Sequence, residues 1–367
     1  MVLTSRWGGC LLLLGMLLLS LLPARTARAL DPNRSVSQYA HTAWRMADGE
    51  LPGIPHAIAQ TADGYLWIGT GGGLVRFDGA RFVPWVAPAG DALCECAILS
   101  LLGARDGSLW IGTRRWLYRV KNGISKKYPL RAQINQIVED SAGSVWIAKS
   151  RLTASDDAPL CRITEAAMTC FGAKDGLPFT KGGLAALAED GSGGMWLGGV
   201  DGVYHWTPKQ ITPHLPPPLA SASGATGVLA LLRQIDGSVL VGVGQSGEGL
   251  GLQRLQDGAW SGFRAHDANG TAWAVSALHA DRSGGLWVAT VRDGIYHVQH
   301  NAVDRFSRQD GLASESPDAL FEDREGNIWV ASSQGIDRFR DLAVVSLTAQ
   351  QGLSLSLIHI SEPTRPY

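Results

Sequence analysis

The stretch Asp63–Gly79, which reads DGYLWIGTGGGLVRFDG, decides the fold because versions of it recur along almost the whole chain. It joins a turn-forming Asp-Gly, a short apolar segment with a central tryptophan, a glycine-rich turn and a second apolar segment. Two further copies are DGSLWIGT at Asp106–Thr113 and GLWVAT at Gly285–Thr290. This alternation of strand-forming and turn-forming residues predicts short β-strands joined by tight turns.

The unit occurs seven times, and one large apolar residue marks the centre of each copy. We expect these residues to form the structural core of the repeat: Trp67, Trp110, Trp146, Trp196, Leu240, Trp287 and Trp329. The steps between them are 43, 36, 50, 44, 47 and 42 residues, close to the roughly 40–50 residues of a four-stranded propeller blade. The sequence therefore predicts an all-β protein, a seven-bladed β-propeller of four-stranded antiparallel blades.

The first unit shows where the strands of a blade should lie. We expect them at 56–61, 65–70, 74–77 and 81–85, from the innermost to the outermost. Both faces of the second strand are apolar, as they are when blade packs on blade. The repeated tryptophans could instead stack on a ligand, but their place in the middle of a doubly buried strand favours packing.

A further outer strand precedes the first unit. Residues Trp44–Gly49 resemble Phe171–Gly176 and Phe306–Gly311, which each follow the third strand of a unit. This early strand could close the ring by pairing with the third strand of the seventh blade, which would remove an exposed edge. Residues Ala343–Leu347, which follow that strand directly, are the competing candidate.

The two ends of the chain differ from the repeats. Residues 1–29 read as a signal peptide, with an apolar run at Cys10–Leu22 and a small-x-small cleavage site at Ala27–Ala29. The run is about 13 residues long, whereas a membrane-spanning helix needs about 20. Residues 355–367 resemble the in-frame translation of a sequencing adapter and are expected to be an artefactual or disordered tail, which leaves 37–354 for the propeller.

Export would permit disulfide bonds. Cys161 and Cys170 flank a predicted hairpin and are the disulfide candidate, with buried thiols as the alternative. Cys94 and Cys96 would point the same way along a strand, so we do not expect them to bond to each other. Neither pair has partners at zinc-site spacing, and no metal site is predicted.

The pattern DGxLWIGT followed by GLxRFDG, best seen at Asp63–Gly79, resembles the two-component regulator propeller repeat. The opening Tyr39–Thr61 also resembles the start of such sensors. The resemblance implies an exported, periplasmic sensor domain of an inner-membrane receptor that is a homodimer when intact. It also implies signal transduction by phosphorelay, through a histidine kinase or, less often, a diguanylate cyclase. That output domain, and any contact with the membrane, would lie in sequence beyond Ser354.

The residues themselves predict no enzyme activity for this fragment. No catalytic acid/base pair, phosphate loop or cofactor site stands out, and a formal net charge of −1 does not indicate a nucleic-acid surface. A propeller hydrolase or lyase is the competing class, because Ser141–Trp146 resembles a sialidase aspartate box. A protein-binding scaffold is a third. The ligand, whether a small molecule, a glycan or a protein, is not identified.

If a ligand binds, one face of the ring is favoured. The turns between second and third strands all lie on that face, and some carry charge where glycine would suffice. The ligand-binding candidates in these turns are Arg114, Arg115, Asp201, Arg292 and Asp293. Their alternative role is that of solvated surface charges.

The signal-peptide interpretation predicts that the exported protein begins at Leu30. Mass spectrometry of protein recovered from the periplasm measures this directly. A mature chain that still contains residues 1–29 would contradict it.

Overall fold

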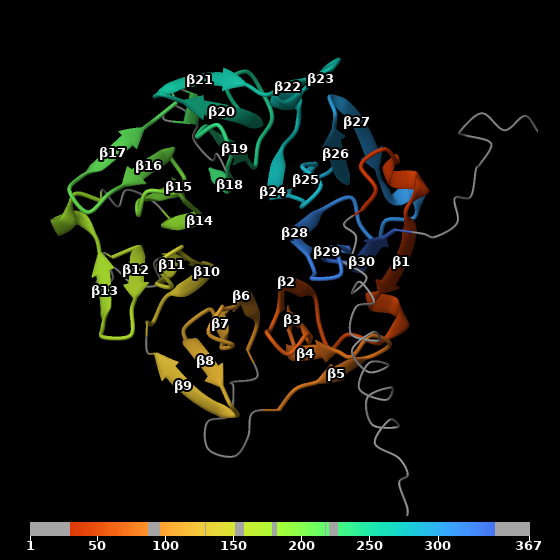
Figure 1. Ribbon diagram of the computed structural model, residues 1–367, viewed down its shortest axis with the longest axis horizontal. Coiled ribbons are helices and arrows are strands. Elements are labelled where there is room, and N and C mark those ends of the chain that lie inside the picture. Colours follow the sequence, from red (N-terminus) through yellow and green to blue (C-terminus); the bar gives the residue numbers. More distant parts are fainter. Residues whose placement is uncertain are drawn as a thin grey trace, which may run out of the picture.

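Seven β-sheets form a ring around a central channel in the computed structural model (Figure 1). The structure describes residues 30–86, 96–128, 130–150, 158–177, 182–216, 218–219 and 227–341. Each of the seven sheets has four antiparallel strands. The predicted seven-bladed, all-β architecture is confirmed.

Six blades are simple meanders whose strands follow the chain from the channel outwards. They are blade 1, β2 (Pro55–Gln60), β3 (Leu66–Thr70), β4 (Gly73–Phe77) and β5 (Phe82–Pro84); blade 2, β6 (Ile98–Gly103), β7 (Leu109–Thr113), β8 (Leu117–Lys121) and β9 (Ile124–Tyr128); blade 3, β10 (Gln133–Glu139), β11 (Val145–Ser150), β12 (Leu160–Ile163) and β13 (Met168–Phe171); blade 4, β14 (Leu184–Glu189), β15 (Met195–Gly199), β16 (Val203–Trp206) and β17 (Ile211–His214); blade 5, β18 (Val228–Arg233), β19 (Val239–Val243), β20 (Leu252–Gln256) and β21 (Ala259–Gly262); and blade 6, β24 (Val275–Ala280), β25 (Leu286–Thr290), β26 (Ile295–Gln299) and β27 (Ala302–Phe306). The short pair β22 (Arg264–Ala265) and β23 (Ala268–Asn269) lies between blades 5 and 6. In blade 1 the observed strands begin and end within one residue of those expected.

The seventh blade is assembled from both parts of the chain. It contains β28 (Pro317–Glu322), β29 (Ile328–Ser332) and β30 (Gly335–Arg340), and its outer strand is β1 (Ala40–Arg45). β1 pairs antiparallel with β30, with Ala40 opposite Arg340 and Arg45 opposite Gly335. The early strand therefore closes the ring. The competing candidate, Ala343–Leu347, lies outside the described residues.

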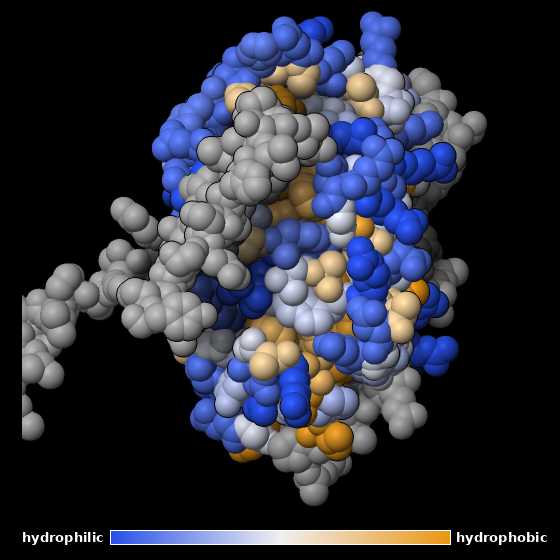
Figure 2. All heavy atoms as spheres, turned by 90° about the vertical axis from the view of Figure 1, so that its right-hand side faces the viewer, coloured by the Kyte–Doolittle hydropathy of each residue, from blue (hydrophilic) through white to orange (hydrophobic). Residues whose placement is uncertain are grey.

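Side chains of β1 tie the closing blade to its surroundings. Trp44 stacks on Trp329 of β29, with ring centroids 5.7 Å apart, and meets Phe77 of blade 1 edge-on at 5.4 Å. Ahead of β1, Arg34 forms an ion pair with Asp341 at 2.6 Å, which holds the N-terminal segment to the end of β30. On the side of the ring that carries this blade, hydrophilic residues cover much of the described surface (Figure 2).

The resemblance between the three outer-strand segments has a structural cause. Each outer strand ends in a 3-10 turn: η2 (Met46–Asp48), η3 (Ala173–Asp175) and η5 (Arg308–Asp310). The aspartate of each turn accepts a hydrogen bond from the backbone N–H three residues earlier, at 2.8–2.9 Å. The glycine that follows has a positive φ, for example 115° at Gly311, a conformation that glycine adopts at little cost.

The hydrophobic core is divided among the seven junctions between blades. Each of seven clusters combines the repeated Trp or Leu of one blade with residues of the next blade. Trp287 of blade 6, for example, packs with Ile328, Val330 and Phe339 of blade 7 and is fully buried. Trp196 is only half-buried and stacks on His205.

A buried aspartate anchors several of the repeated tryptophans. The indole N–H of Trp287 donates to Asp281 at 2.8 Å, and the same carboxylate accepts the backbone N–H of Gly285 in the hairpin turn. Burial alone would raise the pKa of Asp281, but the His297 ring nitrogen 3.4 Å away and hydrogen bonds from Ser283 and the Trp287 indole lower it overall. Equivalent bonds, from a tryptophan to the aspartate six residues earlier, occur at Trp146 and Trp329. Each of these carboxylates thus holds a hairpin turn and a core side chain together.

Cysteine pairing can be described for three residues. Cys161 and Cys170 lie opposite each other on β12 and β13, with a disulfide between them and Cα atoms 4.0 Å apart. Whether this bond forms after export stays a prediction. Cys96 is also disulfide-bonded, and Cys94 lies outside the described residues.

In the part of the chain that the structure describes, no helix is both long and apolar enough to cross a membrane.

Replacing Trp287 with alanine should lower the free energy of unfolding by about 3–5 kcal/mol, because a buried ring and its hydrogen bond to Asp281 are lost together. Urea denaturation measures the change. The matched control is Trp260→Ala in the outer strand β21, where the ring is half-buried and the loss should be smaller. Equal losses in the two variants would contradict the packing role of Trp287.

Candidate functional site

A β-bulge occurs near the start of the innermost strand in every blade. In each pairing of innermost and second strand the register shifts by one residue at the same place. The extra residue stands eleven positions before the repeated Trp or Leu. These seven residues, called the channel ring below, are His56, Leu99, Asn135, Ala185, Leu229, Ser276 and Asp318. Bulges re-aim side chains and are common beside functional sites.

All seven residues of the channel ring line one cavity of about 480 Å³ in the central channel. They lie toward the face that carries the turns between second and third strands, called the loop face below. The polar residues of the channel ring lie mainly on one side of the channel. Ser276, Asp318 and His56 follow one another on blades 6, 7 and 1, whereas Leu99 and Leu229 occupy blades 2 and 5. A ligand in the channel would therefore meet polar groups mainly on one side.

The side chains of two polar residues of the channel ring form hydrogen bonds to the next blade. The Asn135 side-chain amide donates to the Leu184 carbonyl at 2.6 Å, and the Ser276 hydroxyl donates to the Pro317 carbonyl at 2.6 Å. Both acceptors belong to the next blade. The side chains of His56 and Asp318, in contrast, make no hydrogen bond to another described residue. They are the two titratable residues of the channel ring, and both side chains remain able to bind a ligand.

His56 and Asp318 affect each other's pKa across the junction of blades 7 and 1. Burial lowers the pKa of His56 below its ordinary value of 6.5, Asp318 opposes this decrease, and the positive charge of Arg114 adds to it. Burial in the channel raises the pKa of Asp318, and His56 opposes that increase. The pair thus combines a histidine that favours its neutral form with a carboxyl group that is harder to ionise.

The five predicted ligand-binding residues lie in turns on the loop face of three non-adjacent blades. Arg114 and Arg115 are exposed between β7 and β8, and Arg292 and Asp293 are exposed between β25 and β26. Asp201 is half-buried between β15 and β16. Sequence reasoning placed these residues on one face but did not identify the channel ring.

Some of these charges have intramolecular partners. Asp201 accepts a hydrogen bond from the Tyr204 hydroxyl at 2.9 Å, and Asp293 pairs with Arg305 at 3.1 Å. Arg114 differs because its charge acts on His56 of the channel ring. Among the five predicted residues, Arg114 is thus the one whose charge reaches the channel ring.

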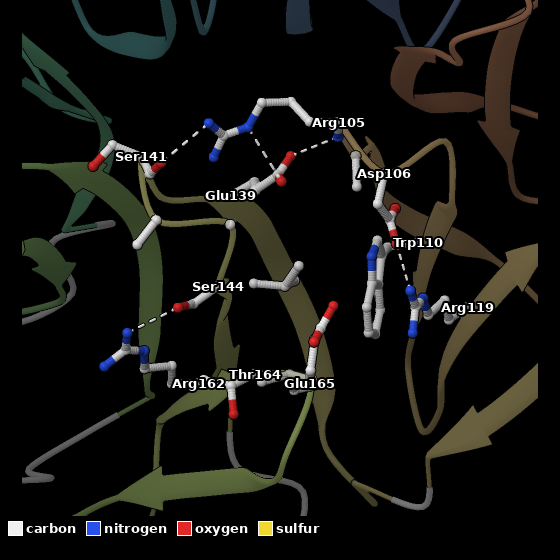
Figure 3. Close-up of a pocket in the computed structure, with 15 residues that line it drawn as sticks. Arg105, Asp106, Trp110, Arg119, Glu139, Ser141, Ser144, Arg162, Thr164 and Glu165 are labelled. Atoms are coloured by element: carbon white, nitrogen blue, oxygen red, sulfur yellow. Dashed lines mark hydrogen bonds and ion pairs between the residues drawn. The ribbon is translucent and has the colours of Figure 1, made fainter.

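The opposite face of the ring carries a groove of about 590 Å³ between blades 2 and 3 (Figure 3). Its charged side chains, apart from Glu165, are paired with other residues of the protein. Arg105 contacts Glu139 at 3.2 Å and donates to the Ser141 carbonyl at 3.2 Å, both in blade 3. Arg162 donates to Ser144 at 2.8 Å. We assign this groove to holding the two blades together, because Arg105 of blade 2 pairs with Glu139 of blade 3 across it.

The same arginine clamp recurs at two other junctions. Arg282 of blade 6 donates to the Asp323 carbonyl of blade 7 at 2.8 Å. Arg324 of blade 7 donates to the Ala62 carbonyl of blade 1 at 2.7 Å, so one clamp spans the closing point of the ring. Within the described ranges no group of three or more His, Cys, Asp or Glu side chains could hold a metal ion.

The channel geometry predicts how the pKa of His56 responds to its neighbours. Arg114→Ser should raise this pKa, because a repelling positive charge is removed, and Asp318→Asn should lower it further, because an attracting negative charge is removed. NMR titration of the His56 ring measures both shifts. Arg115→Ser is the control and should leave the value unchanged. Shifts of the opposite sign would exclude this arrangement.

Two parts of the chain, residues 50–72 and 311–334, match the family model described as two component regulator propeller. No curated protein matches the chain. Several solved structures share its fold. One is the extracellular domain of a candidate hybrid two-component system of B. thetaiotaomicron, with a TM-score of 0.67 and 15% identity over 83% of this chain. A second such domain from B. thetaiotaomicron has a TM-score of 0.65 and 17% identity over 83% of this chain.

The chain spans 42% and 40% of the lengths of those two domains. A streptogramin B lyase structure is similar over nearly its whole length: it has a TM-score of 0.66 and 15% identity, and the match covers 84% of this chain and 99% of the lyase. At such identities the likeness concerns the fold alone. The two matched segments, the recurring unit and the closed ring of blades together establish that the chain contains two-component regulator propeller repeats.

Proposed function

We propose that this propeller is the extracytoplasmic ligand-sensing domain of a membrane receptor that signals by phosphorelay. The observation that carries the proposal is the channel ring, where the side chains of His56 and Asp318 line the channel cavity without hydrogen bonds to other described residues. The family match and the likeness to extracellular domains of candidate two-component systems support the receptor context. Ligand binding at the loop face is the role that these residues suit best.

Signal transmission would depend on the intact receptor. In the proposed arrangement the propeller is periplasmic, and a membrane helix connects it to a histidine kinase or, less often, a diguanylate cyclase. A ligand can shift the equilibrium between two arrangements of a receptor homodimer only if it binds one of them more tightly.

A lyase is the second candidate function, because the lyase structure matches this ring over nearly its whole length. A neutral histidine can act as a general base, and His56 favours its neutral form. An assay of the purified chain with quinupristin, the compound solved with a related virginiamycin B lyase from Staphylococcus aureus, tests this function. We expect binding without turnover.

A protein-binding scaffold is the third candidate function. Probing a glycan array and pulling down partners from periplasmic extract separate a glycan ligand from a protein ligand. Retention of glycans favours the sensor, whereas retention of a single protein favours the scaffold.

The loop-face proposal predicts opposite effects for two variants. Serine at Arg114, Arg115, Arg292 and Asp293 together should weaken binding to the ligand retained in those experiments. It should leave the melting temperature nearly unchanged, because all four side chains are exposed and the surface pair of Asp293 contributes at most about 1 kcal/mol. Trp110→Ala should lower the melting temperature by removing a buried ring. Unfolding of the quadruple variant, or hydrolysis of a glycan by the purified chain, would contradict the proposal.

A further inference from the structure

Positive charge is concentrated in one blade. The 18 residues from Arg114 to Arg131 contain seven Lys or Arg and no Asp or Glu, in a chain whose formal net charge is −1. They form β8, β9 and the adjoining turns, on the outer half of blade 2 (Figure 1). Such a one-signed segment produces a local positive potential that the rest of this slightly acidic molecule does not share.

Only part of this charge is neutralised. Arg119 and Lys121 of β8 both pair with Asp106 in the turn between β6 and β7. The other five cations have no carboxylate within 4.0 Å among the described residues. They are called the basic strip below: Arg114, Arg115, Lys126, Lys127 and Arg131. Elsewhere in the described chain many arginines are paired with carboxylates, for example Arg105 with Glu139.

Aromatic rings hold two of the ammonium groups in place. The Lys127 Nζ lies 3.8 Å from the centre of the Trp116 ring, and the Lys126 Nζ lies 4.9 Å from the centre of the Tyr128 ring. A ring positions a cation without cancelling its charge, so less side-chain freedom is lost when an anion binds. These lysines are therefore ordered in advance and still carry a net positive charge.

The strip is continuous with the mouth of the channel. The backbone N–H of Arg131 donates to the Arg115 carbonyl at 3.0 Å, which places these two residues side by side. Arg114, next along the chain, lowers the pKa of His56 in the channel ring. Positive charge thus extends from the outer strand of blade 2 across the loop face to the hydrogen-bonding groups of the channel.

Protection of an edge strand is an insufficient explanation for this charge. Lysines on an outer strand such as β9 do discourage pairing with other chains. That role does not require arginines in the turn between β7 and β8, or Arg131 beyond the end of β9. The positively charged residues therefore lie along the loop face toward the channel as well as on the edge strand.

We propose that the basic strip binds an anionic polysaccharide, a glycan chain bearing carboxylate or sulfate groups, with one end at the channel mouth. This inference rests on the proposed ligand-sensing role. A polyanion matches a row of unpaired cations, and sugar hydroxyls match the polar side of the channel ring. A protein partner fits less well because protein interfaces have an apolar core. The exposed apolar side chain on this hairpin, Ile124, lies at the opposite end of β9 from the loop face.

The test compares binding of the full chain to heparin, to polygalacturonate and to neutral dextran by calorimetry at several salt concentrations. The strip variant carries Lys126→Ser, Lys127→Ser and Arg131→Asn, with asparagine chosen because φ at residue 131 is 50°. The matched control removes three exposed cations elsewhere, through Lys174→Ser, Lys209→Ser and Arg308→Ser. Thermal melting checks that both variants are folded.

We expect an anionic glycan to bind the unmodified chain, with affinity that falls as salt rises, and dextran not to bind. The strip variant should bind about tenfold more weakly or worse, and the control should bind normally. Heparin carries both sulfate and carboxylate groups, whereas polygalacturonate carries carboxylates alone. Binding to heparin but not to polygalacturonate would therefore identify sulfate as the recognised group, and equal binding to both would identify carboxylate.

Three results would overturn the inference. They are equal weakening in the strip and control variants, no binding of either polymer to the unmodified chain, and tighter binding to vesicles of mixed phosphatidylglycerol and phosphatidylcholine than to either polymer. If the polymers fail but periplasmic extract or a glycan array provides another ligand, the sensing proposal stands without this inference. Sensing itself fails only if the chain retains no ligand in any of these experiments.

Discussion

Closure of the ring by β1 is the constraint on which the rest of the structure depends. Each blade buries both faces of its second strand only if a neighbour covers it on either side, and seven blades in an open row would leave two faces exposed. Pairing of β1 with β30 supplies the missing outer strand and positions His41 beside Asp337, whose carboxylate lies 2.8 Å from the His41 ring nitrogen. Burial raises the pKa of Asp337, and His41 opposes that increase. The final junction thus combines strand pairing, aromatic packing and a buried polar contact.

A closed ring also determines where a ligand can bind. The junctions between blades are held by apolar clusters and, at three of them, by arginine clamps, so most charged groups there already have partners within the protein. The channel is different because each innermost strand presents it with one bulge residue that is not needed for pairing. The bulge occurs at the same place in every blade, whereas the side chain at the bulge differs from blade to blade. Such a position is suited to ligand recognition, and Asp318 and His56 occupy it in neighbouring blades.

The repeat explains how far the fold could be predicted. Blade number, strand order and the choice of outer strand follow from the recurring tryptophan and from the Asp-Gly turns after the outer strands. The aspartate anchors were missed, because the position six residues before the tryptophan holds Asp in four blades but Thr61, Ala104 and Gln234 in the others. The channel ring was missed for a stronger reason: its seven members share no residue type, so no pattern in the sequence marks them. Counting back eleven residues from each tryptophan would have aligned them, but only a structure shows that this position is a bulge.

Two positions that are equivalent in all seven blades, one in the third strand and one in the channel ring, distinguish residues used for packing from residues available for ligand recognition. The third-strand residue opposite the repeated Trp or Leu is an arginine or a histidine in every blade, such as Arg162 opposite Trp146 and His297 opposite Trp287. Arg162 and His297 lie over the indole rings of Trp146 and Trp287, and the presence of a cationic or imidazole side chain at this position in every blade is what a shared packing role requires. The channel ring shows the opposite pattern: the backbone bulge is the same in every blade, but the side chain it carries varies between blades. The basic strip is likewise confined to one blade, although every blade has the same strands. In a molecule built from near-equivalent units, selection for packing acts on all units alike, so the differences between units are where binding specificity must reside.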